Sequence, residues 1–453
     1  MTSLSFLGGA ATATGSRFLV ETDQTRLLVD CGLFQGYKQL RRKNWQPPGF
    51  DPADLDMVIL THADLDHSGY LPALVKQGFD NPVLCTELTR ELCEILLPEA
   101  GSIHQADAER ANQEGYSRHH PAQPLYTEHD ARRAIRLFKT CGFDEAQDFP
   151  NGIGVRFLRA GHIPGAAIVQ LELGGRRIVF SGDLGRYDSP LMHPPERVRL
   201  AHYLVVGSTY GSSVRPEGNP EDLLEDVIQR TVKRGGTVIV PSSAVGHAQG
   251  LLYHLSRLRT SGRIPDIPIY LDSPMAIDAS DLFCRQDAGS RLSAEEARAA
   301  CSAAQCVRDA DQSDKIVADS KPKIVLSTSG IVSGGRVLNY LKRYVPDPHA
   351  TILFSGFQPG GTRAARMLAG ADEIKIHGAW HKVRAEVLNL HILSAHADAN
   401  EIMRWLSGFE APPRRTFIVH GEPDASDTLR HRIQDELGWD CEVPEQGQQV
   451  DLA

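Results

Sequence analysis

The sequence lacks a long apolar run and an excess of positive charge. No stretch of its 453 residues approaches the roughly 20 apolar residues that a membrane-spanning helix needs. The formal net charge is −9, so no general basic field attracts nucleic acid, and any such binding must depend on a local surface. These absences predict a globular protein without a membrane partner.

Two further absences concern export and oxidation. The N-terminus has no basic segment followed by an apolar core, so we expect no secretory signal peptide. The eight cysteines form no C-x-x-C pair, which predicts buried reduced thiols and neither a disulfide framework nor a thiolate zinc site. Both features favour a cytoplasmic location.

Short apolar segments alternate with loops and helices in the first part of the chain, which predicts an α/β architecture. A helical apolar spacing over 132–139 predicts a helix there. The strands expected in this part are 26–30, 57–60, 83–85, 155–158, 168–173, 177–181 and 203–206.

From about residue 207 the pattern becomes a repeated strand–helix crossover, which is typical of a doubly wound parallel sheet. We therefore expect a first domain over 1–206, an inserted α/β domain over 207–375, and a return to the first domain over 376–453. The expected strands are 237–241, 269–272, 323–328 and 351–355, and the expected helices are 221–233, 249–259, 336–344 and 361–368.

The most informative segment is 61–69, where His62, Asp64, Asp66 and His67 follow an apolar strand. Imidazole and carboxylate groups bind borderline-hard cations such as zinc or manganese. Four such groups can hold a pair of ions, and paired ions commonly serve phosphoester hydrolysis. The alternative is a polar loop that caps the next helix.

Further polar side chains occur at the ends of other expected strands or in sharp loops. Because such positions converge on one edge of an α/β sheet, we expect these side chains to lie close together. Each one alone is also compatible with a turn or capping role, so the prediction depends on the whole set. The residues are Asp30, His162, Asp183, His396 and His420.

Together these segments resemble the metallo-β-lactamase superfamily, and specifically its β-CASP nucleases, over nearly the whole chain. The resemblance is closest to bacterial and archaeal forms of the RNA 3′-end-processing endonuclease, whose RNA-cleaving members carry a histidine like His420. It implies a metallo-β-lactamase αββα sandwich with an inserted, Rossmann-like β-CASP domain built on a parallel sheet. The matching segments are 6–10, 14–16, 28–36, 272–276, 329–336, 394–398 and 419–422.

The resemblance also implies two divalent metal ions, with zinc as the expected metal. Asp66, Asp183 and His396 would carry the catalysis, with His396 as the general acid that protonates the leaving oxygen. Asp30 would orient a histidine ligand. One ion would be held by His62, Asp64 and His162, the other by Asp66, His67 and His420, and both by Asp183.

Two positions depart from the family pattern. Relatives have a histidine at the place of Asp64, and the carboxylate adds negative charge that favours manganese or iron. Relatives have an acidic residue at the place of Gly207, which normally partners the general-acid histidine. His396 therefore loses a hydrogen bond and a neighbour that raises its pKa.

Two loops in the expected insertion have a strand–loop–helix form. Backbone N–H groups at such a junction can bind a phosphate, although a glycine-rich turn with a capping serine explains the same residues. Facing a metal site, the loops would line an interdomain cleft that admits a single strand and excludes a duplex. The residues expected to bind RNA phosphate are Ser329, Gly330, Ser333, Gly334, Arg336, Gln358 and Thr362.

The expected function is metal-dependent phosphodiester hydrolysis of single-stranded RNA, in RNA processing or decay. One alternative is an RNA-binding pseudoenzyme whose catalysis is weakened by Asp64 and Gly207. Another is a small-molecule hydrolase of the wider superfamily, against which the β-CASP-like insertion argues. Relatives often dimerise, so a homodimer is one expected state.

Overall fold

The computed structural model describes residues 2–117, 119–285 and 289–453, and the chain forms two compact units. The first unit contains residues 1–104, 124–214 and 396–453. The second contains residues 105–123 and 215–395, so a segment that the sequence did not set apart belongs to it. The division into domains with boundaries at residues 206 and 375 stays a prediction.

The first unit is built on two seven-stranded sheets. In the first sheet, β3 to β6 are parallel and the remaining pairs are antiparallel. In sheet order its strands are β22 (Gln449–Leu452), β1 (Thr2–Gly8), β2 (Arg17–Glu21), β3 (Arg26–Val29), β4 (Met57–Ile59), β5 (Val83–Cys85) and β6 (Phe138–Thr140).

In the second sheet of this unit, β10, β11, β20 and β21 are parallel. In sheet order its strands are β21 (Cys441–Glu442), β20 (Arg415–Val419), β11 (Tyr203–Gly207), β10 (Arg176–Phe180), β9 (Ala167–Leu173), β8 (Ile153–Arg159) and β7 (Ala146–Phe149).

A shared apolar core joins the two sheets of the first unit. The ring of Phe6 from the first sheet lies 5.0 Å from that of Phe417 in the second, and Phe18 stacks on Phe180 at 5.9 Å. All four rings are at most 4% exposed. Each buried phenylalanine contributes roughly 1.5–3 kcal/mol relative to exposure, so this layer is a main source of stability.

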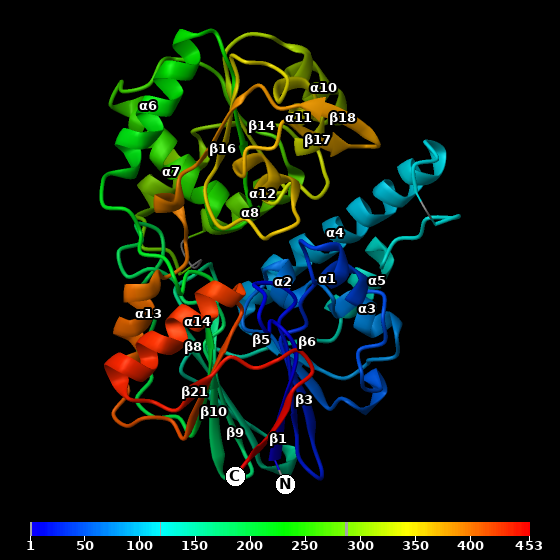
Figure 1. The fold of residues 1–453 in the computed structure, drawn as a ribbon, viewed down its shortest axis with the longest axis vertical. Helices are drawn as coiled ribbons and strands as arrows, with labels where there is room; N and C mark the ends of the chain where they lie inside the picture. The colour runs from blue at the N-terminus through cyan, green and yellow to red at the C-terminus, as the bar shows by residue number, and fades with distance from the viewer. Residues whose placement is uncertain (1, 118, 286–288) are drawn as a thin grey trace. The chain divides into compact units, whose positions relative to one another are not determined.

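Helices cover both outer faces of the sandwich (Figure 1), which confirms the αββα arrangement. Thr127 and Asp398 begin α5 and α13 with capping boxes. One face carries α1 (Lys38–Lys43), α2 (Leu65–Ser68), α3 (Leu71–Lys76), the part of α4 (Glu87–Gln113) up to residue 104, and α5 (Glu128–Ile135), and the other carries α13 (Ala399–Leu406) and α14 (Pro423–Arg432).

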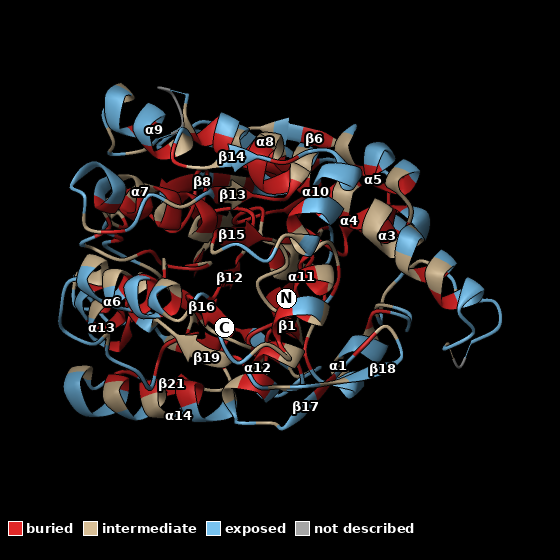
Figure 2. Cartoon of the chain, turned by 90° about the horizontal axis from the view of Figure 1, so that it is seen from above, coloured by how far each residue is buried: buried red, intermediate tan, exposed pale blue. Residues whose placement is uncertain are grey.

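The second unit has a six-stranded parallel sheet with helices around it, as expected for a Rossmann-like domain. Figure 2 shows β12, β13 and β15 as buried strands, and exposed surface on α6 and α9. A separate hairpin joins β17 (Glu373–Ile376) to β18 (Ala379–Lys382). In sheet order the strands are β14 (Gln305–Cys306), β13 (Ile269–Leu271), β15 (Ile324–Ser327), β12 (Val238–Pro241), β16 (Thr351–Phe354) and β19 (Glu386–Asn389).

The helices of the second unit follow the expected crossover pattern between the parallel strands. They are α6 (Pro220–Lys233), α7 (His247–Thr260), α8 (Pro274–Phe283), α9 (Ala294–Cys301), α10 (Ala310–Ala318), α11 (Val337–Tyr344) and α12 (Arg363–Leu368). Within the described ranges, no helix of the chain has the length and apolar character required to cross a membrane.

Two expectations about local structure are wrong. The predicted helix over 132–139 ends at Ile135, because Phe138 is buried in strand β6 and pairs with Val83. The cysteines are not all unpaired, since Cys284 and Cys301 form a disulfide between the ends of α8 and α9. The two cysteines lie 17 positions apart, so the sequence offers no local spacing signal for the pair.

Candidate metal centre

The strand ends of the first unit bring the predicted metal ligands to one place. Asp30 directly follows β3, His420 directly follows β20, and His62 lies just beyond β4. His162 lies in the loop between β8 and β9, and Asp183 follows β10. All five side chains are buried, so the fold holds these polar groups against one another and away from water.

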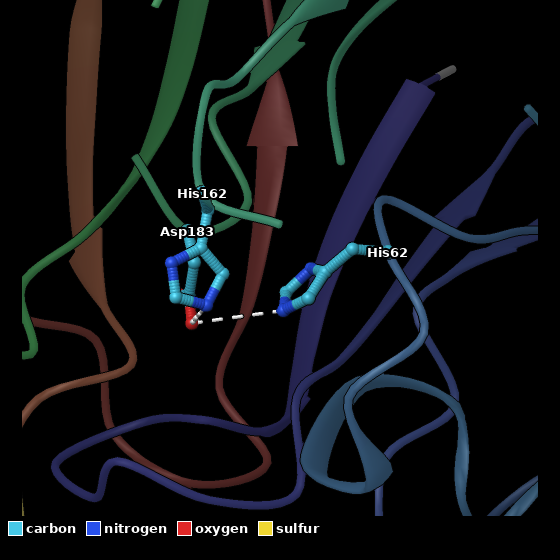
Figure 3. A group of neighbouring side chains, drawn as sticks. All are labelled: His62, His162 and Asp183. Carbon is cyan, nitrogen blue, oxygen red and sulfur yellow. Dashed lines mark ion pairs between the residues drawn. The ribbon is translucent and has the colours of Figure 1, made fainter. Parts of the chain in front are cut away.

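The first cluster consists of His62, His162 and Asp183, whose ligand atoms lie within 4.8 Å of one another. Figure 3 shows the two imidazoles pointing toward the carboxylate. Oδ2 of Asp183 lies 3.7 Å from Nε2 of His62 and 4.0 Å from Nε2 of His162. Asp64 adjoins this cluster, with Oδ2 at 3.3 Å from Nε2 of His162 and a side chain that is 28% exposed.

The second cluster consists of Asp66, His67 and His420. Nε2 of His67 faces Nε2 of His420 at 3.3 Å, and Oδ2 of Asp66 lies 3.5 Å from the same atom of His420. The other oxygen of Asp183, Oδ1, lies 3.7 Å from Nε2 of His67 and 3.8 Å from Nε2 of His420. Asp183 therefore presents one oxygen to each cluster.

Three neighbouring side chains hold the histidines through their Nδ1 atoms. Oδ2 of Asp30 lies 2.7 Å from Nδ1 of His67, as its expected orienting role requires. Thr61 Oγ1 donates to Asp30 and lies 2.9 Å from Nδ1 of His62. Fixing Nδ1 aims Nε2 of each ring into its cluster.

The third of these side chains is Ser16, whose Oγ lies 2.7 Å from Nδ1 of His420. Neither Ser16 nor Thr61 is among the site residues predicted from the sequence. A serine 404 positions away from its histidine carries no spacing signal, although the match of 14–16 to the family pattern pointed to that segment.

The backbone around the ligands is tightly constrained. Asp30 and His420 adopt φ values of 59° and 50°. This is the left-handed backbone conformation, which residues other than glycine rarely adopt. Gly32 has no space for a side chain, because a Cβ there would lie 1.7 Å from the carbonyl oxygen of Asp66. The loop after β3 therefore packs directly on the ligand loop, with Cys31 N donating to the carbonyl oxygen of His67 at 2.7 Å.

The electrostatics of the site suit cations. Burial lowers the pKa of His62 to about 3 and that of His420 to about 4, which keeps both rings in the neutral form that binds metal. Burial and the nearby carboxylates of Asp64 and Asp183 raise the pKa of Asp66 well above its usual range. A divalent cation would relieve this crowding of negative charge.

Two buried atoms test whether these residues fit a metal ion. Among the described residues, Nε2 of His62 and Oδ1 of Asp183 have no hydrogen-bond partner. An unsatisfied buried polar atom costs about 1–3 kcal/mol, so such atoms are rare unless a ligand uses them. Neutral imidazoles and carboxylates are also the donor set of hydrolytic metal sites, so the residues fit divalent ions.

Comparison with known families agrees with this site. The model of the metallo-β-lactamase superfamily matches residues 14–242, and that of the Beta-Casp domain matches residues 248–367. A third model, described as a Zn-dependent metallo-hydrolase RNA specificity domain, matches residues 380–444. The chain belongs to the β-CASP group of the metallo-β-lactamase superfamily. The prediction of a metal-dependent hydrolase is thereby confirmed.

Individual relatives of this β-CASP protein share most of its length. It is 33% identical to Ribonuclease TTHA0252 of Thermus thermophilus, with 92% of each chain covered. It is 31% identical to Transcription termination factor FttA of Pyrococcus abyssi, covering 97% of this chain and 69% of that one. A crystal structure of a protein of unknown function from Enterococcus faecalis V583 has a TM-score of 0.51 at 15% identity, with 99% of both chains covered, and supports the fold alone.

The expected general acid of this β-CASP protein lies beside the first cluster. Nδ1 of His396 is 3.6 Å from Oδ2 of Asp183. Its ring lies 4.2 Å from that of His162 and 5.7 Å from that of Tyr210. Its side chain is 17% exposed, so it borders the site where a substrate can reach it.

Gly207 stands where the family resemblance predicts an acidic residue, and its surroundings show what a side chain there would meet. Gly207 ends β11, and a Cβ built on it would lie 3.5 Å from Oδ1 of Asp183. The same Cβ would lie only 2.8 Å from the carbonyl oxygen of Gly182. A side chain at this position would point toward the metal centre, but the backbone at Gly182 would have to shift first.

The residues predicted to bind phosphate lie in the second unit, and the fold already engages Arg336 and Thr362 among them. Arg336 donates to Asp272 at 2.7 Å and to two backbone carbonyls. The hydroxyl of Thr362 accepts from Ala365 N and donates to Pro359 O. Phosphate binding by these loops stays a prediction. The other residues of the set, Ser329, Gly330, Ser333, Gly334 and Gln358, lie in the loops after β15 and β16.

Proposed function

We propose that this protein is a metal-dependent phosphodiesterase that cleaves single-stranded RNA in RNA processing or decay. The observation that carries the proposal is Asp183, a buried carboxylate with one oxygen toward each of two ligand clusters. RNA as the substrate is supported by the ribonuclease among the relatives and by the RNA specificity domain matched at residues 380–444.

The proposed cofactor is a pair of divalent ions, zinc in the second cluster and zinc, manganese or iron in the first. Asp64 is the reason for the wider choice, because a carboxylate in place of a histidine hardens the site. When bound, such ions neutralise charge on a phosphodiester and lower the pKa of a water molecule. The first cluster would bind through His62, Asp64, His162 and Asp183, and the second through Asp66, His67, His420 and Asp183.

The remaining chemistry belongs to the side chains themselves. We assign Asp66 as acceptor for the proton of the attacking water, because its carboxylate belongs to the second cluster and its side chain is 24% exposed. His396 protonates the leaving oxygen, and its partial exposure gives a substrate access to the ring. Asp30, Thr61 and Ser16 keep the histidine ligands in position.

A second candidate function is RNA binding without cleavage. It is favoured by Gly207, which offers no carboxylate to partner His396 and no room for one without a backbone shift. We prefer the enzyme, because each of the seven predicted ligand positions carries a residue that can coordinate a metal. We further propose a cytoplasmic location, with a homodimer as one expected state that light scattering checks.

The test combines metal analysis with digestion of an end-labelled single-stranded RNA. The wild type is expected to contain divalent metal and to cleave the RNA. Asp183→Ala and His67→Ala should lower cleavage by roughly a thousandfold or more, because each removes a ligand. His349→Ala is the matched control, since this histidine is 62% exposed and lies outside both clusters.

Three results would decide against the proposal. Cleavage that continues in excess chelator would exclude a metal-dependent reaction. Full activity of Asp183→Ala would exclude the shared carboxylate. Wild-type protein that binds metal and RNA but forms no product with zinc, manganese or iron would identify the pseudoenzyme.

A further inference from the structure

A short basic helix with an exposed aromatic side chain at each end is not used by the metal centre. The helix is α1, with Tyr37 before it and Trp45 just after it. Tyr37 is 53% exposed and Trp45 is 60% exposed. No residue of α1 is buried, so the helix has no apolar face packed on the core. Its side chains are therefore available to a partner.

The charge of this segment is uncompensated. Residues 31–50 contain four cationic residues and no Asp or Glu, in a chain whose net charge is −9. Within the part of the chain that the structure describes, none of the four forms an ion pair. Lys38 lies three and four positions before Arg41 and Arg42, a spacing at which like charges repel on a helix. A polyanion would remove this repulsion.

The segment is anchored to the metal centre of its own unit. The side-chain amide of Asn44, directly after α1, accepts from Phe34 N at 3.0 Å and donates to Phe34 O at 2.8 Å. Buried Arg17 donates to Asn44 Oδ1 at 3.3 Å and to Gly32 O at 2.9 Å. Gly32 N donates to the carbonyl oxygen of Ser16, the serine that holds a histidine ligand. This chain of hydrogen bonds keeps α1 in a fixed position relative to the ligands.

We propose that residues 37–45, the basic aromatic segment, bind single-stranded RNA and hold it beside the metal centre. The inference rests on the proposed RNA substrate. Exposed aromatic rings stack on unpaired bases, and lysine and arginine bind the phosphates between them. A duplex offers no unpaired base to Tyr37 or Trp45. A membrane surface fits less well, because Leu40 is the one aliphatic residue of the segment and interfacial helices need an apolar face.

The first experiment measures RNA binding against salt. A fluorescent single-stranded RNA of about 20 nucleotides is titrated with the whole protein in chelator, so that no cleavage occurs, from about 50 to about 300 mM salt. The variant combines Lys38→Gln, Arg41→Gln and Arg42→Gln. Each lost phosphate contact reduces the slope of log affinity against log salt by about 0.7, so the slope should fall by about 2. Affinity at low salt should fall at least about tenfold.

A matched control removes the same charge elsewhere. Arg298, Lys315 and Lys321 are exposed and, among the described residues, form no ion pair. Their combined change to glutamine should move the slope much less than the change in α1 does. Equal effects of the two triple variants would overturn the proposal, because the segment would then contribute only net charge. A wild type that fails to bind the RNA at low salt would overturn it as well.

The aromatic side chains give a second measurement with a different signature. Trp45→Ala and Tyr37→Ala should each weaken RNA binding by roughly fivefold or more, because one stacked base is lost, and should leave the salt slope unchanged. Trp45→Phe should keep most of the affinity. Unchanged affinity in both alanine variants, with thermal melting like that of the wild type, would contradict stacking.

Two comparisons distinguish RNA binding by α1 from membrane binding and from the proposed RNA hydrolysis. Co-sedimentation with vesicles containing anionic phospholipid tests a membrane surface, and α1-dependent vesicle binding with RNA binding unchanged would overturn the RNA proposal. Binding in chelator does not depend on turnover. RNA binding that needs α1, in a protein that never cleaves RNA, would therefore refute the proposed hydrolysis and support the inference. RNA cleavage by the α1 variants, with RNA affinity equal to that of the wild type, would support the proposed hydrolysis and refute the inference about α1.

Discussion

Polar side chains lie just beyond the ends of parallel strands in both units, and those of the metal centre differ from Arg336 in how far the fold uses them. In the first unit, His62 and Asp183 have buried atoms with no hydrogen-bond partner among the described residues. In the second, Arg336 follows β15 and its guanidinium is bound to Asp272, which is 0% exposed. A strand end is therefore not sufficient evidence for a binding site. The side chain must also have hydrogen-bonding capacity that the fold does not use.

The buried carboxylate of Asp272 explains why Arg336 is needed by the fold. It accepts from Arg336 at 2.7 Å, from Tyr340 at 2.6 Å and from Ser313 at 2.5 Å. These donors hold a charge inside the second unit, where an unpaired carboxylate would be strongly unfavourable. Arg336 thus stabilises the unit, whatever it contributes to phosphate binding.

The largest expected effect tests the structural role of Arg336 in the second unit. Arg336→Ala should lower the free energy of unfolding by about 3 kcal/mol, because it leaves a buried carboxylate without its cation. Urea unfolding of the whole chain measures it. Arg298→Ala, at an exposed arginine, should change stability by less than about 0.5 kcal/mol. An Arg336→Ala protein that keeps its stability but loses RNA affinity would show that the two units use their strand ends alike.

The next effect concerns the orienting groups of the first unit. Asp30→Asn keeps the shape of the side chain but removes the charge beside Nδ1 of His67. Metal affinity should fall roughly 10- to 100-fold, as for other partners of metal-bound histidines. Competition with a chelator measures the affinity, and exposed Asp80→Asn serves as control. Wild-type affinity in Asp30→Asn would mean that the histidines need no such support.

The sequence predicted the fold class and the family because both depend on patterns that are local or ordered along the chain. Strand Val83–Cys85 was expected with the same bounds, and the parallel sheet of the second unit followed from the strand–helix rhythm. The nine residues selected for the metal centre and its acid lie in one unit, because family motifs mark strand ends. The ligand roles of these residues stay predictions.

What the sequence could not predict depends on partners that are distant along the chain. Ser16 and Thr61 act through hydroxyl groups whose orientation only the folded chain defines. The engagement of Arg336 depends on Asp272, which lies 64 positions away. The end of α5 was misplaced because pairing with β5 favours strand geometry at Phe138 over a helical spacing. In each case tertiary contacts outweigh local preference.

A smaller effect is expected at Gly207, where the family resemblance predicts an acidic residue. Gly207→Glu and Gly207→Ala both place a Cβ 2.8 Å from Gly182 O, so both should lose roughly 1–3 kcal/mol of stability. The ratio of their RNA cleavage rates isolates the carboxylate. If the missing group limits proton donation by His396, Gly207→Glu should be roughly tenfold faster than Gly207→Ala. Equal rates would contradict that account.

The smallest effect is a change in metal preference. Asp64→His replaces a carboxylate that lies 3.7 Å from Nε2 of His62 with a softer ligand. The ratio of zinc to manganese in protein from cells given both metals should rise a few-fold. Elemental analysis of the purified proteins measures it, with Asp80→His as control. The same ratio in all three proteins would remove Asp64 from the ligand set.

The left-handed backbone at Asp30 and His420 has a consequence for how this chain tolerates change. At either position glycine would relax the main chain, and a protein under pressure for stability alone would be expected to acquire it. The chain instead keeps a carboxylate and an imidazole there. At these two positions the side chain needed for the site imposes a strained backbone conformation. The strain therefore marks positions where function takes precedence over stability.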